Sequence, residues 1–250
     1  MQRTAVIIAS YNMAERADAL ARKVAAMSAD HDIILVDNGS KPEHVAQMAT
    51  LRLTWNVQTT GAWLTGLAYA DALTQMRGSP YGYYWFLITS ADFPHDADVL
   101  TPMVEWMDAH PDAVGVHPAL TPDSTTSWQH LIARGGDQPR RTWMIDNIAS
   151  LYRADWFDSI GRFDGRMRYA WGIDLETCYW ARLKSRGLYV DERVCVRKVT
   201  NIGYTMNRMG MTADDRSRLA GENMRDILSQ KYGADWWHKM TVEGVTDDMR

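Results

Sequence analysis

Three side chains able to bind a ligand, Tyr11, Asp37 and Asp92, each come shortly after an apolar run of the chain. Such runs, apolar without alternation, are typical of strands buried on both faces of a parallel sheet. Ligands of open α/β sheets bind beyond the carboxyl ends of the strands. A carboxylate placed there can hold a cation or take a proton from a ligand. We therefore expect these side chains to meet at one edge of a sheet.

Each carboxylate also has a purely structural interpretation. Asp92 could cap the following helix, and Asp37 begins an Asp-Asn-Gly-Ser stretch that is a strong turn signal. A fourth carboxylate, Asp174, begins a predicted helix, where N-capping is the simple explanation. Taken singly, these explanations suffice. The convergence of Tyr11, Asp37 and Asp92 on one edge favours a site.

The elements that must position these residues alternate between strand and helix. The predicted strands are Thr4–Ala9, Ile33–Val36, Leu51–Val57, Tyr84–Ile88, Ala113–Val116, Thr142–Tyr152 and Leu188–Val196. The predicted helices are Met13–Ser28, Pro42–Thr50, Gly61–Met76, Val99–Ala109, Ala154–Ile160, Asp174–Arg186 and Ala213–Tyr232. This alternation predicts an α/β fold with a doubly wound, mostly parallel sheet and right-handed crossovers.

A long stretch over 120–141 has no clear periodicity and is predicted to be a loop. It contains Arg134, Arg140 and Arg141, so it is locally basic. A loop of this length in a compact domain is more often functional than inert, although a solvated face explains the arginines equally well.

The composition excludes some classes of protein. A net charge of −4 argues against a nucleic-acid footprint over the whole chain but leaves room for a local basic patch. No segment approaches the roughly 20 apolar residues that span a bilayer. Two cysteines without a spacing motif predict a reduced, cytoplasmic protein.

Several stretches together resemble the nucleotide-sugar-dependent glycosyltransferases of family 2, which have the GT-A fold. The resemblance runs from about Thr4 to about Trp236. Its motifs are AVIIASYN at Ala5–Asn12, IILVDNGS at Ile33–Ser40, TGAWLTGLAYADAL at Thr60–Leu73, FLITSAD at Phe86–Asp92 and WGIDLETCYWARLKSRG at Trp171–Gly187.

The resemblance implies a single GT-A-like domain over residues 1–205, with a Rossmann-like, mostly parallel sheet flanked by helices. Residues 1–95 would form the half that binds the nucleotide sugar, and residues 96–205 the acceptor half. Residues 206–250 would form a C-terminal helical extension.

The resemblance also implies roles for individual residues. Asp174 would be the general base of an inverting transfer to an acceptor hydroxyl. Asp92 would hold a divalent cation, Mn²⁺ or Mg²⁺, on the diphosphate. The expected donor-binding residues are Tyr11, Asn12, Asp37 and Ser90. The expected acceptor residues are Trp171 and Arg134.

Two departures from the family pattern bear on the metal. Ser90 stands where the family has the first aspartate of its Asp-x-Asp motif, and Ile173 replaces the first of two late acidic residues. The histidine that many relatives carry after the last strand is missing from the stretch over 196–204, which has Lys198 instead. Either metal binding is weaker than usual, or Lys198 takes over part of the charge neutralisation.

A UDP-sugar is the favoured donor and a saccharide the favoured acceptor, with a hydroxylated nucleic-acid base as an alternative acceptor. Two other functions compete with glycosyl transfer. One is a degenerate, non-catalytic protein that binds nucleotide sugars, which the serine and isoleucine replacements support. The other is a nucleotidyltransferase, which ranks lower because residues 10–13 contain neither the glycine nor the basic residue of a triphosphate loop.

Overall fold

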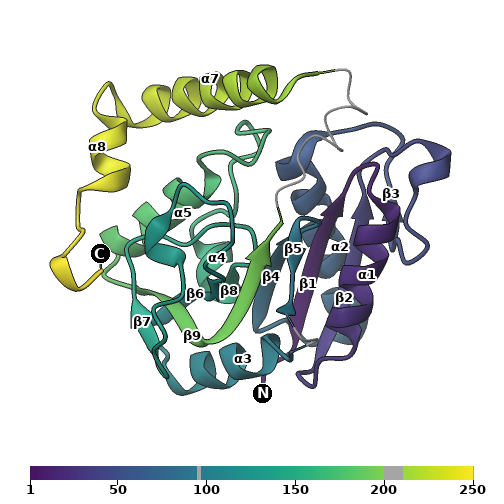
Figure 1. The fold of residues 1–250 in the computed structure, drawn as a ribbon, viewed down its shortest axis with the longest axis horizontal. Coiled ribbons are helices and arrows are strands. Elements are labelled where there is room, and N and C mark those ends of the chain that lie inside the picture. The colour runs from purple at the N-terminus through teal and green to yellow at the C-terminus, as the bar shows by residue number, and fades with distance from the viewer. Residues whose placement is uncertain (95–96, 200–210, 250) are drawn as a thin grey trace.

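The computed structural model describes residues 1–94, 97–199 and 211–249, and Figure 1 shows how its elements are arranged. The strands are β1 (Thr4–Ser10), β2 (His31–Asp37), β3 (Leu51–Arg52), β4 (Tyr83–Ile88), β5 (Ala91–Asp92), β6 (Ala113–Leu120), β7 (Pro139–Arg141), β8 (Leu151–Arg153) and β9 (Gly187–Lys198). The α-helices are α1 (Ala14–Ala25), α2 (Gln58–Arg77), α3 (Leu100–Ala109), α4 (Ala154–Ser159), α5 (Ile173–Leu183), α7 (Ala213–Tyr232) and α8 (Trp236–Thr241). Short 3₁₀ turns are η1 (Pro42–His44), η3 (Gln129–Leu131) and η4 (Asp247–Met249).

The strands form one sheet with the order β3-β2-β1-β4-β8-β6-β9-β5, and β7 pairs with β9 beside this path. β1 runs parallel to both β2 and β4, whereas β8 runs antiparallel to β4 and β6. β6 and β9 are again parallel. Because β1, β2 and β4 are parallel, the residues after Ser10, Asp37 and Ile88 lie at the same edge of the sheet. The predicted fold class, an α/β sheet flanked by helices, is confirmed.

Helices cover both faces of this sheet, and the side chains of β1 show why. Val6 and Ile8 point into a core that contains the buried residues of α1 and α3, whereas Ala5 and Ile7 point into a core with those of α2, α4 and α5. A strand buried on both faces needs apolar residues at every position, which explains its unbroken apolar sequence. Within the described residues, no helix combines the length and apolar character that a membrane span requires.

Two predicted elements in the first half are wrong. The predicted helix over 42–50 is reduced to η1, and the predicted strand over 51–57 is reduced to β3. The chain beyond β3 is held by side chains: Asn38 Oδ1 accepts from the Val57 N–H at 2.9 Å, and Asn56 Oδ1 accepts from Gln58 N–H at 2.7 Å. These local bonds compete with a strand ladder.

Two further differences lie in the second half. Of the predicted strand over 142–152 only β8 is observed, and the predicted loop over 120–141 contains η3 and β7. The segment before β8 supplies carbonyls to the edge of β4, since Phe86 N–H donates to Ser150 O at 3.0 Å and Ile88 N–H donates to Ile148 O at 3.3 Å. Its apolar side chains are buried although most of the segment is not part of a strand. The apolar sequence was therefore not sufficient to predict a strand over 142–152.

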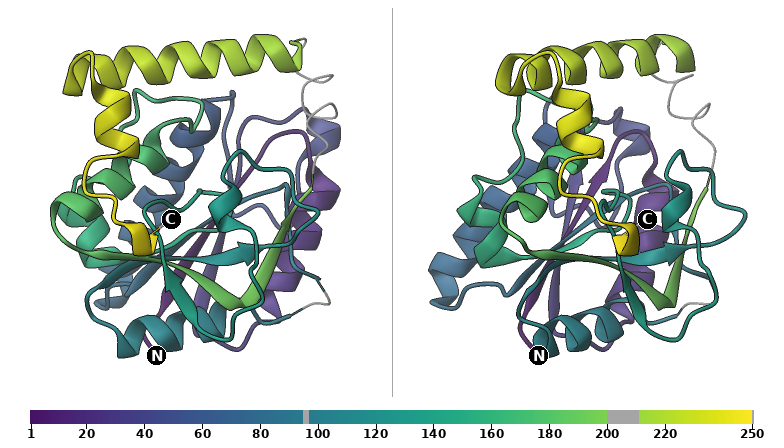
Figure 2. Two further views of the ribbon diagram at one scale, coloured as in Figure 1. Left: turned by 60° about the vertical axis from the view of Figure 1, so that its left-hand side comes forward. Right: turned by 90° about the vertical axis from the view of Figure 1, so that its left-hand side faces the viewer.

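The C-terminal helices lie against the body of the protein. In both views of Figure 2, α7 crosses above the sheet, and α8 turns down from its end. Leu228 of α7 is fully buried, and Asn223 Oδ1 accepts from Arg168 N–H at 2.9 Å. The predicted boundaries after residues 95 and 205 fall within or beside 95–96 and 200–210, which lie outside the described residues.

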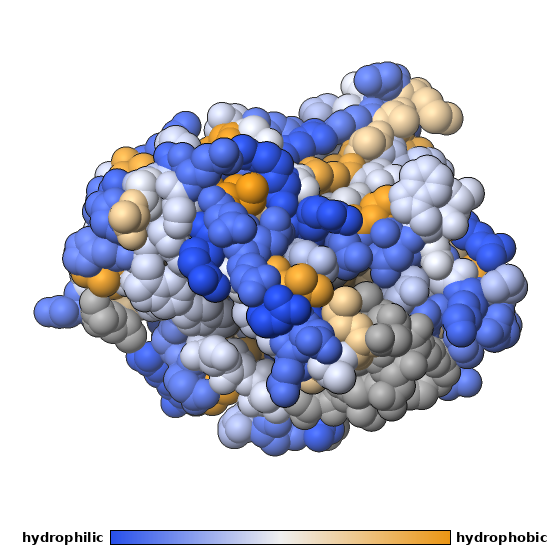
Figure 3. All heavy atoms as spheres, turned by 90° about the horizontal axis from the view of Figure 1, so that it is seen from above, coloured by the Kyte–Doolittle hydropathy of each residue, from blue (hydrophilic) through white to orange (hydrophobic). Residues whose placement is uncertain are grey.

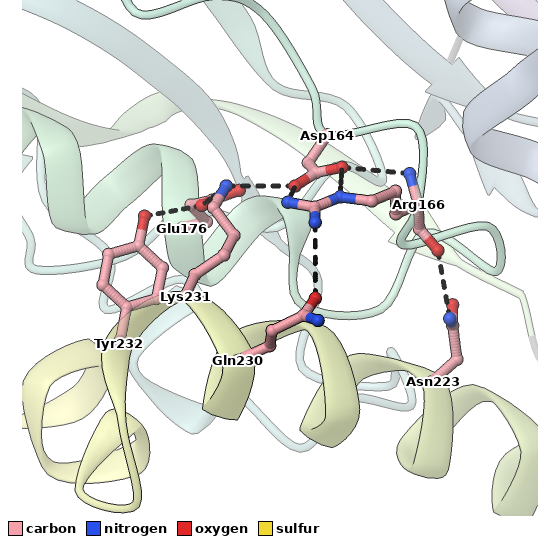
Figure 4. A network of polar contacts seen from close by, with 7 residues as sticks. All are labelled: Asp164, Arg166, Glu176, Asn223, Gln230, Lys231 and Tyr232. Carbon is pink, nitrogen blue, oxygen red and sulfur yellow. Dashed lines mark hydrogen bonds and ion pairs between the residues drawn. The ribbon is translucent and has the colours of Figure 1, made fainter.

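A polar network fastens the end of α7 to the body (Figure 4). Lys231 forms ion pairs with Asp164, at 3.0 Å, and with the buried Glu176 of α5. Tyr232 Oη donates to Glu176 Oε1 at 2.6 Å. Because Glu176 is buried, its charge depends on these partners.

Lys231→Met is therefore expected to lower the free energy of unfolding by roughly 1–3 kcal/mol, since it leaves a buried carboxylate with the tyrosine alone. Urea denaturation at pH 7.5 measures the loss. Arg218→Gln is the matched control on the same helix, because Arg218 pairs with Glu222 on the exposed face and such pairs contribute about 0–1 kcal/mol. Equal losses in the two variants would show that the network does not hold α7.

Candidate active site

A pocket opens at the carboxyl ends of β1 and β4. Its volume, counted out to the open mouth and including open solvent there, is about 820 Å³. Seen from above, the side on which α7 lies, the surface is mostly hydrophilic, with hydrophobic side chains scattered over it (Figure 3). The pocket is lined by Ala9, Ser10, Tyr11, Met13, Arg16, Asn38, Asn56, Gln58, Thr59, Ile88, Thr89, Ser90, Val199 and Arg216.

The floor of the pocket is built where β1 ends. Asn12 is fully buried and has a φ of 52°, a left-handed conformation that asparagine tolerates better than most residues. Its N–H donates to Ser40 Oγ at 2.8 Å, and its Oδ1 accepts from Lys41 N–H at 2.9 Å. Asn12 thus ties the end of β1 to the turn after β2, and its neighbour Tyr11 lines the pocket.

Asp37, at the end of β2, pairs in register with Ser10. It is fully buried and does not line the pocket itself. Its Oδ1 accepts from Ser40 N–H at 3.0 Å, which is the predicted turn chemistry. Its Oδ2 is also buried and has no hydrogen-bond partner among the described residues. A buried carboxylate oxygen without a partner is costly, so a donor from a ligand would stabilise it.

One wall of the pocket is an asparagine pair. Asn38 Nδ2 donates to Asn56 Oδ1 at 3.1 Å, and both residues also accept from backbone N–H groups at the start of α2. Gln58, which follows, has a φ of 67°. Non-glycine residues in this conformation cluster at functional sites.

Ser90 and Asp92 are placed differently, although they are two residues apart. Ser90 lines the pocket, and its carbonyl accepts from Val199 N–H at 2.9 Å. Asp92 lies on β5, outside the pocket lining, with its side chain 40% exposed. Its Oδ1 forms an ion pair with Lys23 Nζ of α1 at 2.9 Å.

Asp174 belongs to a second cluster with Asp146 and Lys198. Burial, and then the nearby Asp146 carboxyl, raise the pKa of Asp174 to about 7. Burial also raises the pKa of Asp146, whereas the positive charge of Lys198, 3.8 Å from Asp146, opposes the rise. Lys198 directly precedes Val199 in the chain, and Val199 lines the pocket. A carboxyl that changes charge near neutral pH is suited to general-base chemistry.

The backbone around Asp174 depends on Gly172. Gly172 precedes α5 with a φ of 88°, and a Cβ there would come within 2.6 Å of Met224 of α7. Only glycine satisfies both conditions. Asp174 then lies in the first turn of α5, where its Oδ1 accepts from Leu175 N–H at 2.8 Å.

The two residues expected to contact an acceptor lie apart. Trp171 is 44% exposed, and a Cβ on Gly221 of α7 would approach its ring to 3.9 Å. Arg134 lies in the loop before β7, outside the pocket lining, and its N–H donates to Glu192 Oε2 at 2.7 Å. The other two arginines of the predicted loop over 120–141 lie on β7 and have acidic partners: Arg140 pairs with Glu192, and Arg141 pairs with Asp248. These pairs reduce the positive charge that the loop offers to a nucleic acid.

The structure thus gathers part of the predicted site. Tyr11 and Ser90 line the pocket, Asn12 and Asp37 support its floor, and Asp174 lies in the cluster with Asp146 and Lys198.

Sequence reasoning missed the pocket residues Arg16, Asn38, Asn56, Gln58 and Arg216, together with Asp146 of the cluster. Asp146 left a signal, because it is a charged residue within an otherwise largely apolar run. The other residues left no signal in the sequence, because they come from separate parts of the chain that only the fold brings together.

The described residues do not fit a carboxylate-held cation in this pocket. The described lining contains no acidic side chain, and Asp92 is engaged by Lys23 outside it. Within the described parts of the chain, no three His, Cys, Asp or Glu side chains are grouped as metal ligands.

Comparison with known proteins bears on the fold and the family. The profile of the glycosyl transferase family 2 matches residues 5–170 and so ends shortly before Asp174. No curated protein sequence matches the chain.

Two solved structures share the fold. One is GalNAc-T7 with UDP, GalNAc and Mn²⁺, which is 11% identical in sequence and matches with a TM-score of 0.62. The matched region covers 81% of this chain and 44% of the GalNAc-T7 chain. The other is the mannosyltransferase PcManGT from Pyrobaculum calidifontis with GDP-Man and Mn²⁺, which is 14% identical in sequence and matches with a TM-score of 0.59. The matched region covers 96% of this chain and 74% of the PcManGT chain. The chain therefore spans less than half the length of the first of these proteins.

Proposed function

Because the chain belongs to the glycosyl transferase family 2, we propose that it transfers a sugar from a nucleoside-diphosphate sugar to an acceptor hydroxyl. The observation that carries the proposal is the pocket at the carboxyl ends of β1 and β4, together with Asp174, a carboxyl group whose pKa is about 7.

Tyr11 and Asp37 hold the nucleoside in this proposal. The Tyr11 ring flanks the base, and Asp37 Oδ2 accepts from an imide N–H of the base or from a ribose hydroxyl. The unpartnered Oδ2 supports this role, as does the position of Tyr11 in the pocket lining. Asn12 keeps the loop that carries Tyr11 in place. UDP is the favoured nucleotide.

Asp174 acts as the general base in this proposal. Its carboxylate takes the proton of the acceptor hydroxyl while that oxygen attacks the anomeric carbon from the side opposite the diphosphate. The bond between the anomeric carbon and the diphosphate oxygen breaks, its electron pair leaves with the diphosphate, and the anomeric centre is inverted. The raised pKa of Asp174 supports this role, since a base that titrates near pH 7 is effective at neutral pH.

A saccharide is the favoured acceptor. The exposed Trp171 supports this choice, because a flat indole ring stacks well on a sugar and because Trp171 closely precedes Asp174 in the chain. A hydroxylated nucleic-acid base is the less favoured alternative, since two loop arginines are paired with acidic side chains.

A screen of UDP-, GDP- and dTDP-sugars by thermal unfolding tests the donor. A donor present at 100 times its Kd stabilises the folded state by about 2.7 kcal/mol, which raises Tm by roughly 5–10 °C. We expect one nucleotide class to give this shift and to be hydrolysed slowly in the absence of an acceptor. Absence of a shift with every donor would contradict the proposal.

Donor binding without hydrolysis, and without transfer to any of a broad panel of saccharides, would instead identify a non-catalytic nucleotide-sugar-binding protein. An affinity for the acceptor that falls steeply as the salt concentration rises would indicate that the acceptor is a nucleic acid.

A further inference from the structure

Two of the described residues that line the pocket are arginines. Arg16 belongs to the first turn of α1, and Arg216 belongs to the first turns of α7. Within the described part of the chain, neither guanidinium is paired with a carboxylate, and the remaining described lining residues are uncharged. The pocket is therefore positively charged on its inner surface.

Arg216 is the more enclosed of the two arginines. Its Nε is buried and meets no hydrogen-bond partner among the described residues, and burial lowers the pKa of its guanidinium. Removing such a group from water without a partner destabilises the protein unless something else compensates. An anionic ligand in the pocket would compensate, and the planar guanidinium fork matches phosphate oxygens closely.

The position of Arg216 is fixed by the C-terminal helix. Asn223, Lys231 and Tyr232 attach α7 to residues of the body, as described above. The helix therefore carries Arg216 to the ends of β1 and β4 although it is distant from them in the sequence.

The carboxylate expected to hold a cation is directed elsewhere. Asp92 is bound to Lys23, which also donates to Phe93 O at 2.9 Å. Ser90 occupies the first position of the same motif. Its side chain is uncharged, and it lines the pocket. Among the described lining residues, the charged side chains that the pocket offers to a diphosphate are thus those of Arg16 and Arg216.

We propose that Arg16 and Arg216, rather than a carboxylate-held metal ion, neutralise the diphosphate of the donor. This inference rests on the proposed function. As the bond from the anomeric carbon to the diphosphate oxygen breaks, the electron pair stays on that oxygen. The two guanidinium groups donate hydrogen bonds to the phosphate oxygens and stabilise the charge that develops.

Calorimetric titration of the full chain tests this inference, with UDP, GDP and dTDP and with uridine, guanosine and thymidine as probes. Each titration is run in EDTA and again in Mn²⁺. We expect the wild type to bind one diphosphate comparably in both. Arg16→Gln and Arg216→Gln should each weaken that binding by about 10- to 100-fold and leave the matching nucleoside unaffected.

Arg218→Gln, on the exposed face of the same helix, is the matched control and should leave diphosphate binding unchanged. Arg216→Lys tests the charge separately and should restore part of the affinity, while thermal unfolding verifies that each variant is folded.

Loss of diphosphate binding in EDTA would overturn the inference and leave the proposed function intact. Wild-type affinity in both glutamine variants would do the same. Failure of the wild type to bind any of the three diphosphates, even with Mn²⁺, would instead overturn the proposed function together with this inference.

Discussion

Asp174→Asn is expected to lower transfer by on the order of 10²–10⁴-fold, the usual contribution of a positioned general base. The Kd for the donor should stay unchanged, because Asp174 does not line the pocket. Asparagine keeps the oxygen that accepts from Leu175 N–H and is an equally good helix cap, so α5 should remain intact. Single-turnover transfer and donor titration measure the two effects. Wild-type turnover in this variant would reduce Asp174 to a helix cap.

The stability of the same variant distinguishes a strained catalytic carboxyl from a structural one. Burial and Asp146 raise the pKa of Asp174 to about 7 in the folded protein, against about 3.9 in the unfolded chain. The folded state then binds the proton more tightly, so stability decreases as the pH rises from about 4 to about 7. Asp174→Asn removes this penalty. The variant should be more stable than the wild type at pH 8, by on the order of a few kcal/mol at most, and similar at pH 4.5.

The second large effect is expected from Asp146→Asn. Transfer should rise with pH as Asp174 loses its proton, with a midpoint near 7 in the wild type. Burial is the larger cause of the raised pKa and remains in the variant, whereas the repulsion from Asp146 is lost. The midpoint should move down by about one pH unit, and transfer at pH 6 should increase by about fivefold.

Lys198→Met is the opposite variant. It removes the positive charge that opposes the rise of both pKa values, so the midpoint should move up rather than down. The pH profile of kcat for the wild type and the two variants measures these shifts. Identical midpoints in all three proteins would show that the cluster does not set the protonation of the base.

The α/β fold could be predicted from the sequence because its signal is local. β4 and the Ala5–Ala9 stretch of β1 are apolar at every position, and both strands are buried on both faces of the sheet. The shared edge of β1, β2 and β4 follows from their parallel direction, which explains why Tyr11, Asp37 and Asp92 were expected to meet there. The donor-binding roles, including those of Asn12 and Ser90, were predicted from the family resemblance. The same local reasoning failed for 142–150, where apolar side chains are buried without a ladder.

What the sequence by itself determined is therefore where β1, β2 and β4 end, to within one residue, since those ends depend on neighbouring residues. Only the tertiary structure decided which charged groups meet. It turned Asp92 toward Lys23, brought Asp146 and Lys198 to Asp174, and carried Arg216 on α7 to the pocket that Arg16 also lines. The direction of a side chain and its distant partners depend on how helices pack on the sheet, and no periodicity in the chain encodes that packing.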